Sequence, residues 1–331
     1  MTTEQTETTE KPEQIEPPAI VVEFADYLKS ERHFADSTAE SRSFDLVQFV
    51  SYMESQSKDQ SKDVSIETKD KRALLVEATT GSINAFLDFL KEEKHPKDPA
   101  KKKYSKATIA KKLAALRSFY KFLVKRNHRN EDPTKPIKPP KVDKKLPRFL
   151  EYEEVKRLLN APEINTFAGA RDRAILETLY STGMRVSELV ALNMDCIDFL
   201  GEVVHIRPKK KKERIAPIGS SALQTIQHYM AYRNKRAQSA GNFDSTVLFV
   251  SDKGKRLSTR YVREITKKHV IKAGLDSDIC PHTLRHSFAV HMISNGADKR
   301  SVAELLGHQQ LTYVDIYGHL AERRSHSIRI K

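Results

Sequence analysis

The nine residues PHTLRHSFA (281–289) decide how the C-terminal half of this 331-residue sequence is interpreted. Pro281 suits the first turn of a helix, and His282 and Arg285 then lie one turn apart on the same helix face. A second stretch, STGMRVSEL (181–189), places Arg185 just after Gly183, which can end one helix where the next begins. Helix starts favour anions, and two arginines that converge on a phosphate can donate paired hydrogen bonds to its oxygens. Each of these residues alone is more often structural, so only their combination indicates a site.

Three further stretches complete the C-terminal half: KKKKERIAPIG (209–219), LLGH (305–308) and VDIYGHL (314–320). The runs 202–207 and 214–218 have β-strand character, so the four lysines between them predict the tip of a hairpin. Helical patterns surround these strands. The sequence therefore predicts a mainly helical unit with a small antiparallel β-sheet.

The N-terminal half shows helical periodicity. Apolar stripes at 20–28, 44–53, 83–90 and 109–123 predict four helices, and Ser105 can cap the last one. The polar side of that helix is basic and supplies candidate DNA contacts: Lys111, Lys112, Arg117 and Lys121. The alternative is a plain helical bundle whose lysines only keep it in solution.

Composition shifts divide the chain. Residues 1–17 are rich in Thr, Glu and Pro and are expected to be a disordered tail. A helical unit is expected over 18–127, with a polar loop or insertion at 54–78. Residues 128–148 are rich in proline and lysine, which blocks helix formation and favours an extended linker. Residues 149–331 form the second unit.

The charge balance favours a polyanionic partner. Lys and Arg number 58 against 44 Asp and Glu, giving a net charge of +14, and nucleic acid is the commonest partner of such a surface. A solvated basic surface without a partner is the alternative. The two cysteines, Cys196 and Cys280, lack metal-site spacing and are expected to be reduced and buried. The sequence contains no signal-peptide pattern or apolar run of about 18 residues, so we expect a cytoplasmic protein.

In these stretches the chain resembles the tyrosine recombinases, and most closely their Xer members. The matching boxes hold Arg185, His282 with Arg285, His308 and Tyr317 in the family order. KATIAKKLAALRSFYKFLV (106–124) resembles the fourth N-terminal helix of Xer proteins, and LPRFL (146–150) resembles the linker exit. The resemblance covers roughly 18–325 and implies a helical SAM-like core DNA-binding domain followed by an α+β catalytic domain.

The resemblance also implies residue roles. Tyr317 attacks the scissile phosphate and forms a 3′-phosphotyrosyl link. Because a phenol has a pKa of about 10, it needs activation, with His282 as base or hydrogen-bonding partner. Arg185, Arg285 and His308 stabilise the charge of the transition state. Lys209 is the candidate general acid for the leaving 5′-oxygen.

The lysine assignment is open, because Lys210 is a rival for Lys209. Lys210 and Lys212 are further candidate DNA contacts. Glu188 occupies the family's supporting acidic position, and an ordinary surface ion pair is its alternative reading. One phosphodiester is exchanged for another phosphoester, so we expect no cofactor and no metal.

The expected partners are double-stranded DNA carrying a recombination site, a Holliday junction, and three further protomers in a homo- or heterotetramer with a second recombinase. A DNA translocase is a candidate activator. The implied role is resolution of chromosome dimers at a dif-like site during cell division. Two alternatives remain: a mobile-element or phage integrase with the same chemistry, and a non-catalytic basic DNA-binding module.

Overall fold

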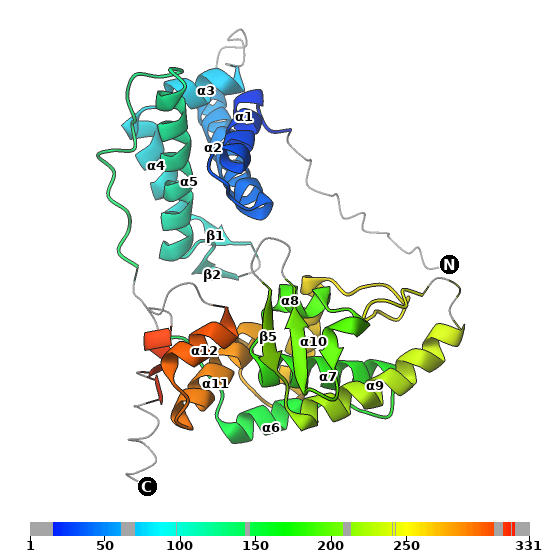
Figure 1. The fold of residues 1–331 in the computed structure, drawn as a ribbon. Helices are drawn as coiled ribbons and strands as arrows, with labels where there is room; N and C mark the ends of the chain where they lie inside the picture. Colours follow the sequence, from blue (N-terminus) through cyan, green and yellow to red (C-terminus); the bar gives the residue numbers. More distant parts are fainter. Residues whose placement is uncertain are drawn as a thin grey trace, which may run out of the picture. The chain divides into compact units, whose positions relative to one another are not determined.

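The chain folds into two compact units, Met1–Lys144 and Lys145–Lys331, shown in Figure 1. This computed structural model describes residues 16–60, 70–96, 98–142, 146–207, 213–239, 241, 243–307, 314–318 and 320–321. Each unit has its own apolar core. The predicted fold class, mainly helical with small antiparallel sheets, is confirmed.

The N-terminal unit is helical apart from one short hairpin. Its elements are α1 (Ala19–Ser30), α2 (Asp36–Gln60), α3 (Lys71–Glu77), α4 (Thr80–Glu92), β1 (Lys94–His95), β2 (Asp98–Lys102) and α5 (Lys106–Lys125). The predicted cap of α5 is confirmed, since the Ser105 side chain accepts a hydrogen bond from the backbone N–H of Thr108. Buried aromatic rings from α1 and α5 meet in its core, with Phe24 and Phe119 edge to face at 5.4 Å between centroids. Such rings supply much of the buried apolar area of a small unit.

The prediction of a loop over 54–78 is wrong at both ends. Helix α2 continues to Gln60, and α3 occupies Lys71–Glu77. Asp70 caps α3 by accepting a hydrogen bond from the backbone N–H of Arg72, and Leu74 and Leu75 are buried. A seven-residue helix is too short to be stable alone, so burial of these leucines against the core is what holds it.

The C-terminal unit carries a three-stranded sheet among helices. Its elements are α6 (Tyr152–Asn160), α7 (Phe167–Thr182), α8 (Val186–Ala191), η1 (Met194–Cys196), β3 (Ile197–Asp198), β4 (Val203–Ile206), β5 (Arg214–Pro217), α9 (Ser220–Ser239), α10 (Thr259–Lys272), α11 (Pro281–Ser294) and α12 (Lys299–Leu306).

The sheet is antiparallel in the order β3-β4-β5, with Val204 opposite Ala216 and Ile206 opposite Arg214. The two predicted strands thus form, and Val204, Ile206 and Ala216 face the core. Their pairing makes residues 207–213 the connection between β4 and β5, although the predicted lysine tip, 208–212, lies outside the described residues.

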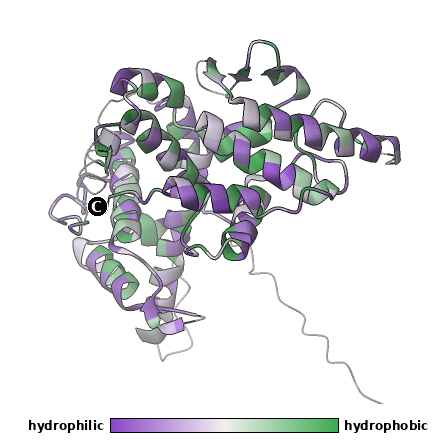
Figure 2. Ribbon diagram, turned by 90° about the horizontal axis from the view of Figure 1, so that it is seen from below, coloured by the Kyte–Doolittle hydropathy of each residue, from purple (hydrophilic) through white to green (hydrophobic). Residues whose placement is uncertain are grey.

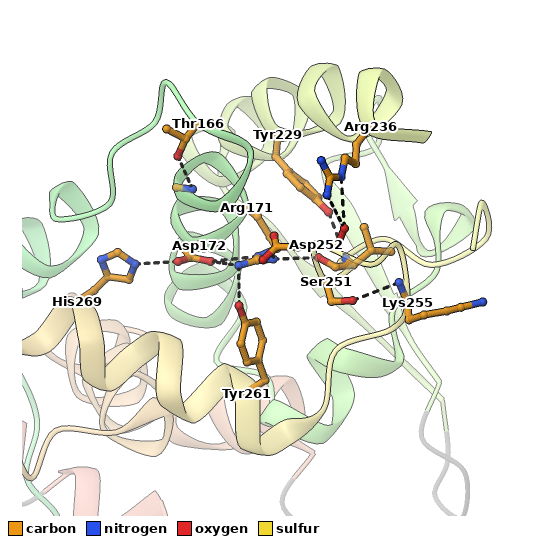
Figure 3. Close-up of polar contacts among 12 residues, drawn as sticks. Thr166, Arg171, Asp172, Tyr229, Arg236, Ser251, Asp252, Lys255, Tyr261 and His269 are labelled. Carbon is orange, nitrogen blue, oxygen red and sulfur yellow. Dashed lines mark hydrogen bonds and ion pairs between the residues drawn. The ribbon is translucent and has the colours of Figure 1, made fainter. Parts of the chain in front are cut away.

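Helix α7 runs through the middle of the unit and packs against α9, α11 and β5. It is buried on nearly all sides, and its buried residues include the charged Arg171, Asp172 and Glu177. Figure 3 shows Arg171 and Asp172 of α7 between His269 of α10 and the loop residue Asp252. Asp172 accepts hydrogen bonds from Arg171 at 3.0 and 3.1 Å and contacts Nε2 of His269 at 2.9 Å. Burying such charges is tolerable only because they are paired.

The helices are amphipathic, and Figure 2 shows hydrophilic and hydrophobic residues on the same helices. Among the described residues no single helix is long and apolar enough to cross a membrane, and α3 with α4 reaches that length and composition only as a pair bent by 104°. Cys196 is buried as expected. Cys280 is exposed, contrary to the prediction, because it precedes the first turn of α11 as its N-cap residue.

Candidate active site

The first arginine of the site lies where α7 passes into α8. Helix α7 ends at Gly183, whose φ of +59° is left-handed and favours glycine. A Cβ there would lie 2.5 Å from Cδ1 of Phe288, so the position is also sterically closed. This turn places Arg185 at the N-cap of α8, half-buried, as the sequence predicted.

Glu188 holds Arg185 in place. It accepts a hydrogen bond from the Arg185 backbone N–H at 2.8 Å and one from Nη1 at 3.1 Å. The Glu188 side chain is only 5% exposed, so the alternative of an ordinary surface ion pair is wrong.

Arg214, which the sequence analysis did not single out, completes this cluster. Its Nη1 and Nη2 donate to the two Glu188 carboxylate oxygens, each at 2.8 Å. Burial by itself would raise the pKa of Glu188, but the hydrogen bonds from Arg214 and from the Arg185 backbone outweigh it and lower the pKa to about 2. Glu188 is therefore a carboxylate at every physiological pH.

Arg214 also ties the β4–β5 connection to α12, because its Nε donates to the Leu305 carbonyl at 2.9 Å. It is the first residue of β5, so it follows directly on the segment that holds the candidate lysines. Lys209, Lys210 and Lys212 themselves lie outside the described residues, as does His308. Their placement stays a prediction.

The His-x-x-Arg pair stands on α11, which begins at Pro281 as predicted. Arg285 is 3% exposed and donates to two backbone carbonyls, Gly183 at 2.6 Å and Leu306 at 2.7 Å. These two hydrogen bonds fix the guanidinium of Arg285. The Leu306 carbonyl also lies 3.5 Å from Nη1 of Arg185, so it contacts both arginines. The two arginines of the prediction are thus brought together from segments 100 residues apart in the sequence.

The electrostatics of this pair favour an anion. Burial lowers the pKa of Arg285 to about 10, and repulsion from Arg185 adds to the effect. Arg285 remains charged at neutral pH. Two cations that repel each other in a partly buried site are stabilised by a phosphate placed between them.

His282 is exposed one turn before Arg285. Burial of its ring, followed by the charges of Arg285, Arg185 and Arg263, lowers its pKa below the usual range. It is therefore neutral at pH 7 and able to accept a proton or a hydrogen bond.

Tyr317 lies in a helical segment, 314–318, whose Val314 shares a buried apolar cluster with residues of α11 and α12. Its side chain is 4% exposed. Its hydroxyl is 2.8 Å from Nδ1 of His286, a residue that the sequence analysis overlooked although it directly follows Arg285. Burial raises the pKa of the Tyr317 phenol, while the charges of Arg285 and Arg185 lower it. The phenol therefore lies within the electrostatic field of both arginines in the same subunit.

The proposed DNA contacts of α5 divide into two groups. Lys111 and Lys121 are exposed. Lys112 is buried in an ion pair with Asp45 at 2.6 Å, and Arg117 donates to the Ile137 carbonyl. Lys111 and Lys121 are therefore accessible to a partner, whereas Lys112 and Arg117 make contacts inside the unit.

Comparison with known proteins identifies the family of the chain. Residues 148–324 match the Phage integrase family, and residues 21–127 match the Phage integrase N-terminal SAM-like domain. The chain belongs to the phage integrase family. It is a tyrosine site-specific DNA recombinase, as the resemblance implied.

Its relatives carry Xer names. The chain is 37% identical to tyrosine recombinase XerC of Syntrophus aciditrophicus, over 90% of this chain and 92% of the other. It is 34% identical to tyrosine recombinase XerD of Oceanobacillus iheyensis, over 92% and 94%. The fold resembles that of XerH site-specific recombinase bound to palindromic difH substrate, with a TM-score of 0.65 and 21% identity over 93% of this chain and 84% of that one.

Proposed function

We propose that this recombinase cuts one DNA strand at a time with the phenol of Tyr317 and rejoins it to a new partner. The observation that carries the proposal is the placement of that phenol beside two converging arginines within one subunit. In this proposal Arg185 and Arg285 bind the non-bridging oxygens of the scissile phosphate and stabilise the charge that gathers there.

The chemical step breaks the phosphorus–oxygen bond to the 5′-oxygen and forms one to the tyrosine oxygen. The phenol proton goes to His282, which is neutral and exposed beside Arg285. The leaving 5′-oxygen takes a proton from Lys209, with Lys210 as the rival. His308 donates to the phosphate. The products are a 3′-phosphotyrosyl link and a free 5′-hydroxyl, and religation reverses the same transfers.

Arg214 supports this scheme by geometry. It grips Glu188, which fixes Arg185, and it begins the strand that follows the lysine segment. In this proposal the lysine of that segment acts on the phosphate that the arginine cluster binds. Lys210 and Lys212 contact the DNA backbone in this proposal, together with the exposed Lys111 and Lys121.

For the biological role we propose resolution of chromosome dimers at a dif-like site in the cytoplasm, because the relatives over 90% or more of the chain are named XerC and XerD. Such a role requires a tetramer, made of four copies of this chain or of this chain together with a second recombinase. The tetramer holds two DNA sites, which are joined in a Holliday junction during the exchange. A DNA translocase would activate the tetramer. A mobile-element integrase is the alternative, since the similar folds include lambda integrase on a core site, at 17% identity and a TM-score of 0.63.

A suicide substrate tests the chemistry. It carries a nick near the cleavage site, so that the cut strand diffuses away and the covalent protein–DNA adduct accumulates. We expect an adduct with the native protein and none with Tyr317→Phe, although both bind DNA equally. Binding without an adduct by the native protein would instead support a non-catalytic DNA-binding module.

The lysine is tested with the same substrate. Lys209→Ala should slow adduct formation, and a sulfur in place of the bridging 5′-oxygen should restore it, because a thiolate leaves without a general acid. If Lys210→Ala alone shows this slowing and rescue, the assignment passes to Lys210.

A further inference from the structure

His286 contacts the hydroxyl of the proposed nucleophile, Tyr317. It follows Arg285 on α11, and its Nδ1 lies 2.8 Å from the Tyr317 hydroxyl. The two rings are inclined at 48° with centroids 5.5 Å apart, so they also pack against each other. This contact joins α11, which carries Arg285, to the segment that carries the nucleophile.

The protonation states of the pair follow from burial. Burial lowers the pKa of His286 to about 4, and the neighbouring His282 and Arg285 lower it further in the same direction. Burial raises the pKa of the Tyr317 phenol. At neutral pH the contact therefore joins a neutral imidazole to a neutral phenol.

The direction of this hydrogen bond follows from the charges around it. The charges of Arg285 and Arg185 act on the phenol. The orientation of lowest energy therefore points the oxygen lone pairs toward the two arginines and the hydroxyl proton away from them. Before the reaction we assign the phenol as donor and Nδ1 of His286 as acceptor, which leaves the imidazole proton on Nε2. As the bond to phosphorus forms, the hydroxyl proton passes from this contact to His282, the proposed base.

His286 is a poor proton acceptor for the reaction. Transfer of a proton from this phenol, whose pKa is raised by burial, to an imidazole whose pKa is lowered to about 4 is strongly disfavoured. A role in orientation is free of this penalty.

We propose that His286 is a positioning residue that directs the lone pairs of the Tyr317 oxygen toward the phosphate held by Arg185 and Arg285. The proposal rests on the nucleophilic role of Tyr317 given above. A nucleophile that is misdirected by about 1 Å loses about two powers of ten in rate, so a single hydrogen bond of this kind is enough to matter.

Three substitutions separate a hydrogen bond from simple packing. In His286→Asn, the amide oxygen occupies nearly the position of Nδ1 and can still accept the phenol proton. In His286→Gln, the amide reaches the position of Nε2 instead, and His286→Ala removes the acceptor entirely. The Asn and Gln variants are matched in polarity, so they differ mainly in where the acceptor lies.

The measurement is single-turnover adduct formation on the suicide substrate at saturating protein. We expect His286→Ala and His286→Gln to be about 10- to 100-fold slower than the native protein, with unchanged DNA affinity. We expect His286→Asn to stay within about 5-fold, and its rate to depend on pH above 6 as the native rate does, because His286 does not titrate there. A bridging 5′-sulfur should leave the slow variants slow, since their defect is on the nucleophile side.

Either of two results overturns the proposal: His286→Ala cleaving at the native rate, or His286→Asn being as slow as His286→Gln. Should His286→Ala fail to fold, the comparison of Asn with Gln still decides. Loss of the adduct in the native protein would refute the proposed function itself, which is a distinct outcome.

Discussion

Replacing Glu188 by Gln tests the idea that this carboxylate holds the arginine cluster together. Its pKa lies at about 2, against an ordinary 4.5. A difference of about 2.5 pKa units corresponds to about 3 kcal/mol of free energy of unfolding at neutral pH. Glutamine keeps the shape but loses the charge that Arg185 and Arg214 share, so we expect a loss of about 3 kcal/mol.

The assay is calorimetric unfolding of the full chain. A loss of this size lowers the Tm of a unit of nearly 190 residues by about 6 to 12 °C. The matched control is Glu264→Gln in the same unit, where an exposed carboxylate pairs with an exposed Arg260 at 2.9 Å. Exposed pairs contribute little, so its Tm should not change measurably.

The sign of the pH dependence gives a second check. The folded-state pKa is depressed, so the stabilisation is complete above pH 4.5 and fades as the pH falls from 4.5 toward 2. The native protein and Glu188→Gln should therefore converge in that window. A Tm difference below 2 °C at pH 7, or one that stays constant down to pH 3, would refute the reasoning.

Three other expectations follow from the same structure. Gly183→Ala should lower the free energy of unfolding in denaturant by about 2 to 4 kcal/mol, because its φ is left-handed and a Cβ would lie 2.5 Å from Phe288. Gly274→Ala, with φ of +64° and nothing within 4 Å of a Cβ, should lower it by only about 1 kcal/mol. Equal losses in the two variants would contradict this reasoning. Asp172→Asn should cost about 3 kcal/mol because the buried Arg171 would keep only Asp252, at 3.4 Å, as a charge partner; a loss below about 1 kcal/mol in the same assay would show that the network relaxes. Lys121→Ala should make the slope of log K for DNA binding against log salt shallower by about 0.9, whereas Lys112→Met, at a buried position, should leave it unchanged; the reverse result would show that α5 presents a different face.

Local signals in the sequence mark several of the helix ends. Ser105, Ser258 and Asp298 cap α5, α10 and α12, and Gly183 and Gly307 end α7 and α12. These are interactions over three or four residues, so they can be recognised without the fold. Helix α3, which was not predicted, has a good cap but depends on burial of Leu74 and Leu75 for its stability.

The sequence by itself determined the candidate residues of the active site, because Arg185, the His282–Arg285 pair and Tyr317 are recognisable by type, order and spacing. Only the tertiary structure decided which neighbours act on them. Arg214 reaches Glu188 across 26 positions, His286 reaches Tyr317 across 31, and Arg285 reaches the Gly183 carbonyl across 102. The tertiary structure also buried Lys112, which the basic pattern of α5 had marked as a DNA contact. Such pairings are set by the packing of distant segments against a common core, and packing leaves no local periodicity or spacing in the sequence from which they could be predicted.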